Sequence, residues 1–202
     1  MIILLPTSGC RMKRCGFTMI ELLVVLAVIA ILVGIMLPVV SGVLARSATH
    51  KTQSQFAQYA IAYESFKADY GFYPSMGMDE SVFGLARNNP VFIQTLSGRR
   101  KDGSRADHGY ALRSNQRLIR YYTFGPSDFG LEDTAYAGEL VDGFGNPNVY
   151  VVIDRDRNGV IEGSTLSGLP EELRPDRLNG GVFFYSSNAS NNPDWEWVLS
   201  WE

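Results

Sequence analysis

The sequence predicts an α+β fold in which a long N-terminal helix packs against a small antiparallel β-sheet. Residues 17–37 form an almost uninterrupted apolar run, and an amphipathic helical repeat follows between Phe56 and Tyr70. The second half of the chain holds short runs of β-branched and aromatic residues separated by turn residues. A helix followed by several short strands is typical of an antiparallel sheet laid on a helix.

The apolar run divides the chain into a membrane segment and a more polar remainder. About 20 consecutive apolar residues span a bilayer as a helix, and Glu21 is the only charged residue between 17 and 37. Gly34 and Pro38 lie near the end of the run, and a proline is expected to kink or interrupt a helix because it removes a backbone hydrogen bond. We therefore expect a transmembrane helix over residues 17–38.

The positions of the cysteines argue against disulfides and cysteine-ligated metals, and the net charge argues against nucleic-acid binding. Both cysteines, Cys10 and Cys15, precede the apolar run, so a chain cleaved before Phe17 has no disulfide and no cysteine-ligated metal. The same cleavage removes three of the 18 basic residues, which leaves 15 against 21 acidic ones and a net charge of −6. An acidic chain binds nucleic-acid phosphates poorly, so we expect no nucleic-acid partner.

The N-terminus departs from an ordinary secretory signal peptide. Such a peptide has about 7–15 apolar residues followed by a small-residue cleavage site, whereas the run here is longer and no such site follows it. A plain signal anchor accounts for every feature except Glu21. Charged residues inside a membrane are costly and usually mark function. The alternative is that Glu21 lies at the headgroup boundary.

The residues around Glu21 match a known processing motif. Residues 16–26 read Gly-Phe-Thr-Met-Ile-Glu-Leu-Leu-Val-Val-Leu, which resembles the prepilin motif shared by type IV pilins and type II secretion pseudopilins. The resemblance implies that a prepilin peptidase cuts after Gly16 and methylates the new N-terminus at Phe17.

The resemblance also implies a leader peptide of residues 1–16 that stays in the cytoplasm, in line with the basic residues Lys13 and Arg14. Leaders in this family are often very short. Translation from Met12 would give a typical one, so both Met1 and Met12 stay open as starts.

The motif implies a contact between subunits. After cleavage the Phe17 amine lies four residues from Glu21 on the same helix face, so the two charges could neutralise each other within one chain. The resemblance implies instead that Glu21 meets the Phe17 amine of a neighbouring subunit. A heterologous contact that does not close generates a helical filament. In the family, the proline at the position of Pro38 marks where the helix bends or locally melts as subunits pack.

A second stretch of helix is expected over residues 39–74. Apolar and aromatic residues recur there at three- and four-residue steps, so this stripe is expected to pack in the core. The helix should end at Gly71, a C-cap glycine followed by Pro74. Together with the membrane segment it makes one helix of about 50 residues. The stripe consists of Phe56, Tyr59, Ala60, Tyr63, Phe66 and Tyr70.

The globular head is expected over residues 75–202. Residues 75–118 are polar and glycine-rich, and we predict a long loop with one short helix near residues 89–97. A basic cluster in this loop is interpreted as solvated, with partner docking as the alternative; it consists of Arg99, Arg100, Lys101 and Arg105. Four strands are predicted, at Ile119–Phe124, Val149–Ile153, Val182–Ser187 and Trp195–Trp201.

The turn before the strand predicted at Val149–Ile153 helps to distinguish a pseudopilin from a pilin. Asp142–Pro147 reads Asp-Gly-Phe-Gly-Asn-Pro, and it resembles in part the Asp-Pro-Trp-Gly-Asn-Pro turn of the type II secretion major pseudopilin. Gly143 replaces proline and Phe144 replaces tryptophan. Tyr70–Pro74 also resembles the end of the long helix in major pseudopilins.

These segments favour a pseudopilin, a filament subunit that drives protein secretion as a periplasmic piston. The alternatives are a type IV pilus or DNA-uptake pilin, with roles in adhesion, motility or competence, and a membrane-anchored periplasmic domain that does not polymerise.

A candidate calcium loop follows the strand predicted at Val149–Ile153. Residues 154–159 read Asp-Arg-Asp-Arg-Asn-Gly, which fits the start of a pattern that offers oxygen ligands to a hard cation around a glycine turn. Thr165 replaces the glutamate expected at position 12, and an Asx-rich turn is the alternative. The candidate Ca²⁺ ligands are Asp154, Asp156, Asn158, the Val160 carbonyl and Glu162.

No catalytic pattern stands out in the sequence. His50 and His108 are its only histidines, and it has no nucleophile elbow, phosphate loop or histidine-rich metal motif, so we do not expect an enzyme. The resemblance implies a single-pass inner-membrane protein with a cytoplasmic N-terminus and a periplasmic head. Its implied partners are the prepilin peptidase, other pilin or pseudopilin subunits in homo- or hetero-polymers, and an inner-membrane assembly platform.

Overall fold

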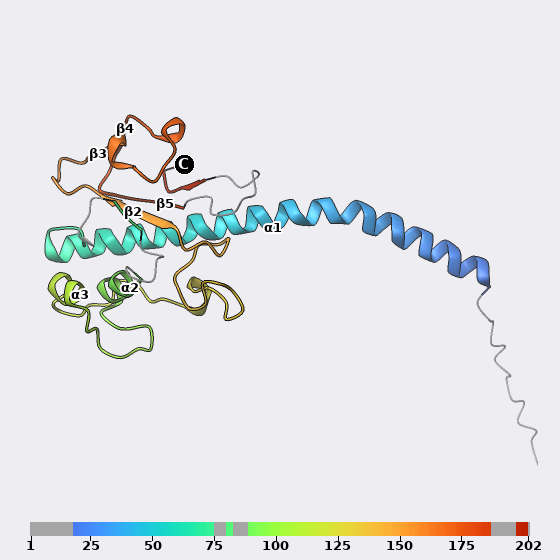
Figure 1. The fold of residues 1–202 in the computed structure, drawn as a ribbon, viewed down its shortest axis with the longest axis horizontal. Helices are drawn as coiled ribbons and strands as arrows, with labels where there is room; N and C mark the ends of the chain where they lie inside the picture. The colour runs from blue at the N-terminus through green and yellow to red at the C-terminus, as the bar shows by residue number, and fades with distance from the viewer. Residues whose placement is uncertain (1–17, 75–79, 83–88, 187–196, 202) are drawn as a thin grey trace, which may run out of the picture. The chain divides into compact units, whose positions relative to one another are not determined.

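The computed structural model describes residues 18–74, 80–82, 89–186 and 197–201, without the side chains of residues 37–41 and 80–82 (Figure 1). The chain divides into two compact units, Met1–Val43 and Leu44–Glu202. Each unit is considered by itself below.

Helix α1 spans Met19–Tyr70 and has 52 residues, which confirms the predicted helix of about 50 residues. Its helical conformation continues through Gly34 and Pro38, so the proline does not break the helix, and a kink there stays a prediction. A proline removes only one backbone hydrogen bond, and the rest of a long helix retains its own. At the other end Gly71 has a φ of 77° and its N–H donates to the Lys67 carbonyl over 2.7 Å, as a C-cap glycine does.

The Leu44–Glu202 unit contains a four-stranded antiparallel sheet in the order β1-β2-β5-β6. A two-stranded antiparallel sheet pairs β3 with β4. The strands are β1 Glu80–Val82, β2 Val149–Ile153, β3 Val160–Glu162, β4 Arg177–Asn179, β5 Val182–Ser186 and β6 Val198–Leu199. Among the described residues, the helices besides α1 are α2 Asn89–Ser97 and α3 Gly109–Ser114, with three short 3-10 helices, η1 Pro126–Asp128, η2 Gly163–Thr165 and η3 Glu171–Leu173.

Most of the predicted elements are present. The helix near residues 89–97 and the strand at Val149–Ile153 match α2 and β2, and the strand predicted at Val182–Ser187 matches β5. Within Trp195–Trp201 the strand is shorter, since β6 covers Val198–Leu199, and residues 195–196 lie outside the described part. The predicted loop also contains α3 and β1.

The strand predicted at Ile119–Phe124 is wrong. The backbone N–H groups of Tyr121 and Tyr122 both donate to the Leu96 carbonyl, over 2.8 and 3.1 Å, instead of pairing with a strand. The aromatic side chains of the segment pack against the core from a coil. The aromatic residues of this segment therefore indicate that it is buried, and they do not indicate that it pairs as a strand.

The main sheet is buried on both faces. Alternate residues of β2 and β5, such as Val151 and Phe184, pack toward α1 and α2 in one cluster. The intervening residues, such as Val152 and Tyr185, pack in a second cluster with Ile161 of β3 and Leu178 of β4. Burial on both faces explains why β2 and β5 read as continuous apolar runs rather than alternating ones.

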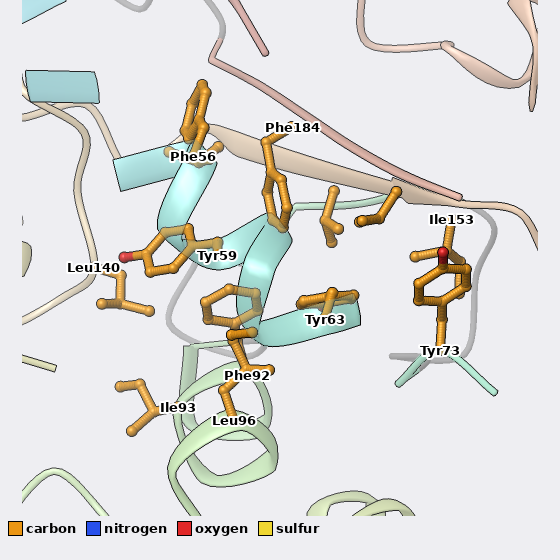
Figure 2. Packing of buried hydrophobic residues seen from close by; sticks show 14 of the residues in the cluster. Phe56, Tyr59, Tyr63, Tyr73, Phe92, Ile93, Leu96, Leu140, Ile153 and Phe184 are labelled. Atoms are coloured by element: carbon orange, nitrogen blue, oxygen red, sulfur yellow. The ribbon is translucent and has the colours of Figure 1, made fainter. Parts of the chain in front are cut away.

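Phe56, Tyr59 and Tyr63 of the predicted aromatic stripe lie in the first cluster, between α2 and β5 (Figure 2). Phe56, Tyr59 and Tyr63 are at most 2% exposed. The ring of Tyr59 lies 5.2 Å from Phe92 of α2 and 5.8 Å from Phe184 of β5, measured between centroids. The helix therefore supplies the core on which the sheet of this unit packs.

The Asp142–Pro147 turn docks onto α1 through Gly143. Its backbone N–H donates to Thr52 Oγ1 over 2.9 Å, and a Cβ added at Gly143 would lie 2.2 Å from the Ala48 carbonyl oxygen. A proline at position 143 would have no N–H to donate. The departure from the Asp-Pro-Trp-Gly-Asn-Pro pattern thus fits a close contact between this turn and the helix.

Replacing Gly143 with alanine is expected to destabilise the unit by about 1–3 kcal/mol, because the added methyl group meets helix backbone. Gly109→Ala is the matched control, since the nearest atom to its added Cβ is an Arg113 side-chain nitrogen 3.8 Å away. Thermal unfolding of the full chain in a neutral detergent, followed by tryptophan fluorescence, measures the effect. Equal melting temperatures for the two variants would contradict the close docking.

Candidate processing and assembly site

The first turn of α1 is closed by a capping box. The Thr18 backbone N–H and hydroxyl both donate to Glu21 Oε2, each over 2.8 Å, and the Glu21 N–H donates back to Thr18 Oγ1 over 3.3 Å. Thr18 is the N-cap and Glu21 the third helical residue, the spacing that such a box requires. Glu21 therefore has a partner in its own helix, besides the two partners considered from the sequence.

Thr18 is a site residue that the sequence reasoning missed. The signal was present, because a threonine followed three residues later by glutamate before an apolar run indicates a helix start. A negative side chain in the first turn also interacts favourably with the helix dipole. The capping box thus fixes both where α1 begins and where the Glu21 carboxylate points.

The helix beyond this box exposes apolar side chains on every side. Within the described residues, one helical segment, Met19–Met36, is long and apolar enough to cross a membrane, and none of it is buried. Ile20 and Leu23 are 71% and 66% exposed. A helix that is apolar all round requires an apolar environment, either a bilayer or neighbouring helices.

Three predicted residues of this site are not placed in detail. Gly16 and Phe17 lie outside the described residues, and Pro38 lies within α1 with its side chain undescribed. Their processing and assembly roles stay predictions.

Residues 11–37 match the family described as the prokaryotic N-terminal methylation motif. The match includes Gly16, Phe17 and Glu21 and ends within the apolar segment of α1. The chain is type IV pilin-like at its N-terminus. No curated protein and no solved structure matches the chain.

A pilin-like N-terminus is typical of structural subunits. It implies processing by a prepilin peptidase and polymerisation with other pilin subunits. Together with the apolar helix it indicates a membrane-anchored protein.

The predicted basic cluster lies on the surface beside α2. Arg100 forms an exposed ion pair with Asp107 over 3.0 Å. Lys101 donates to the Gly138 carbonyl over 2.9 Å and lies over the Phe129 ring, with Nζ 4.4 Å from the centroid. Arg99 also donates to the Gly103 carbonyl over 3.2 Å, so at least three of the four basic side chains have partners among the described residues. Lys101 joins this loop to the segment around Gly138.

The candidate calcium residues lie between β2 and β3. Asp154 follows the last residue of β2, Asp156 and Asn158 lie in the connecting loop, and Val160 and Glu162 begin and end β3. The structure therefore brings all five into one loop and its adjoining strand. Among the described residues there is no cluster of three or more histidine, cysteine, aspartate or glutamate side chains suited to a metal ion. A site here would need amide and carbonyl oxygens as well as carboxylates.

Proposed function

We propose that this chain is a structural subunit of a type II secretion pseudopilus, cleaved after Gly16 and polymerised through α1 to drive protein secretion. The observation that carries the proposal is the start of α1, where a methylation motif and a fixed carboxylate at Glu21 precede a fully exposed apolar helix. Before assembly the helix is held in the inner membrane, with the head in the periplasm. In the filament the helices of neighbouring subunits replace the lipid.

Glu21 is proposed to recognise the incoming subunit. Both of its hydrogen bonds from Thr18 go to one carboxylate oxygen, Oε2. The methylated amine of a neighbour's Phe17 is a cation that fits this carboxylate. Pairing lets both charges enter the apolar interior of the filament together, whereas either alone would oppose burial.

The type II assignment is supported by the head. The Asp142–Pro147 turn ends two residues before β2 begins, and it differs from the pseudopilin turn at Gly143 and Phe144. The resemblance of this turn to that of major pseudopilins favours secretion over a pilus.

Changing Glu21 to glutamine tests the assembly step. Glutamine also completes a capping box, so the helix start is kept and only the charge is lost. We expect normal cleavage and membrane insertion, with sheared filaments reduced roughly tenfold or more because the neighbour's amine loses its counter-charge. Mass spectrometry of the mature N-terminus and immunoblotting of the sheared fraction measure the two steps.

Glu132→Gln is the matched control, since it removes an exposed carboxylate from the head. It should assemble as the wild type does. If the Glu21→Gln variant gave as many filaments as the wild type, the proposed pairing of Glu21 with the Phe17 amine would be contradicted. A wild-type chain that is processed but gives no filaments would favour a non-polymerising anchor.

Deleting the gene distinguishes secretion from the pilus alternatives. A pseudopilin deletion should leave exported proteins trapped in the periplasm while twitching and DNA uptake continue. Loss of motility, adhesion or transformation with normal secretion would assign the chain to a type IV pilus or DNA-uptake apparatus.

A further inference from the structure

The loop that joins β2 to β3 begins with a buried carboxylate. Asp154 is 4% exposed, and its backbone N–H donates to the Gly181 carbonyl over 2.9 Å. Its Oδ2 accepts from the Gly159 N–H over 2.8 Å, while its buried Oδ1 accepts no hydrogen bond from the described residues. A buried carboxylate oxygen without a partner is costly, so Oδ1 calls for a ligand.

A second carboxylate lies against the first. The side chains of Asp156 and Asp154 lie within hydrogen-bonding distance of each other. Two carboxylates in contact need either a shared proton or a cation between them.

The rest of the loop adds neutral oxygens around the same place. The Asn158 amide donates to Asp156 Oδ2 over 2.8 Å, and its Oδ1 accepts from the Val160 N–H over 2.7 Å. The positive φ values of Arg157 and Gly159, 60° and 80°, turn the chain tightly here. The loop borders a depression of 280 Å³ whose lining includes Asp154, Asp156, Asn158, Val160, Glu162 and Thr165.

We propose that this loop binds Ca²⁺. The ligands would be the free Oδ1 of Asp154, the Asp156 carboxylate, the Asn158 amide oxygen and the Val160 carbonyl, with Glu162 or water completing the shell. This set of oxygens suits a hard cation. The site is independent of the assembly proposal, because it lies in the head and uses none of the residues at the start of α1.

The charges near the loop set the expected affinity. Arg155 also lines the depression, and Glu162 lies opposite Arg177 in the β3–β4 register. A calcium site binds more weakly when it has few carboxylate ligands and when arginines lie nearby. We therefore expect a dissociation constant of roughly 10⁻⁴–10⁻³ M, the range of extracellular modules. Such a site would be filled outside the cytoplasm and empty inside it.

The test uses the full chain in a neutral detergent after treatment with EGTA. Calorimetric titration with CaCl₂ should give saturable binding, and the unfolding temperature of the head should rise by about 2–5 °C at calcium tenfold above the dissociation constant. KCl at matched ionic strength should give no such rise. The proposal is overturned by an equal rise in KCl, or by neither heat nor a rise with calcium.

Asp154→Asn tests whether calcium binds at this loop. Asparagine keeps an oxygen for the Gly159 N–H, so the variant should fold and melt in EGTA at least as high as the wild type. Its calcium affinity should fall at least roughly tenfold. Asp133→Asn, which removes an exposed head carboxylate, should keep the wild-type response. An unchanged response in Asp154→Asn would place the binding elsewhere and overturn the proposal.

Discussion

Replacing Phe184 with alanine is expected to lower the free energy of unfolding of the head by about 3–5 kcal/mol. Phe184 has no exposed surface, and its ring lies 5.9, 5.8 and 5.5 Å from those of Phe56, Tyr59 and Tyr63, measured between centroids. It therefore joins the sheet to the aromatic stripe of α1. Truncation removes these contacts and leaves a cavity that the surrounding rings cannot easily fill.

Urea unfolding of the full chain in detergent measures this loss. All three tryptophans lie between residues 195 and 201, so their fluorescence reports on the head. Phe183→Ala is the matched control on the same strand, because Phe183 is only partly buried and packs on the other face. We expect it to cost less than half as much. Similar losses for both variants would contradict a core centred on the helix stripe.

Replacing Asp142 with alanine is expected to cost about 3–5 kcal/mol, because three hydrogen-bond donors lose their acceptor together. The Asp142 carboxylate accepts from the backbone N–H groups of Phe144 and Asn146, over 2.8 and 2.9 Å, and from the Ser186 hydroxyl. Asp142 and Ser186 are buried. The variant should release the turn from both the sheet and α1, and the same urea titration measures the loss.

Asp142→Asn is the control for this second change. Asparagine keeps the shape and an oxygen for the backbone donors, so it should cost much less than alanine. Burial raises the pKa of Asp142 above its ordinary value of 3.8. The folded state therefore holds the proton more tightly, and this group lowers stability as the pH rises from 3.8 through the raised pKa. Asp142→Asn should remove that part of the decline. Equal costs for asparagine and alanine would contradict the hydrogen-bonding role.

Strong local signals made the helix and the central strands predictable. The aromatic stripe has the helical period, and Gly71 ends the helix because it readily takes a positive φ. Strand β2 is an apolar run of five residues, and β5 has four apolar or aromatic residues before Ser186. These elements follow from patterns that lie within a single segment of the chain.

The remaining elements depend on contacts that no single segment reveals. Strands β3 and β4 have three residues each and are defined by pairing with each other. The segment around Tyr121 looks like a strand, but its N–H groups bond to the end of α2. At the candidate site, the motif identified Glu21 but not Thr18. The need for a glycine at position 143 follows from the Ala48 carbonyl of α1, which lies too close for a Cβ, and this contact joins two segments far apart in the sequence.

In the proposed filament, the capping box at the start of α1 affects how strongly an arriving subunit binds. A free glutamate side chain samples many rotamers, and fixing one at the moment of binding costs entropy. Because the hydrogen bonds from Thr18 already fix the Glu21 side chain when the helix forms, this entropy is lost before binding. An arriving subunit would therefore meet a preorganised carboxylate, and more of its binding energy would remain for holding the filament together.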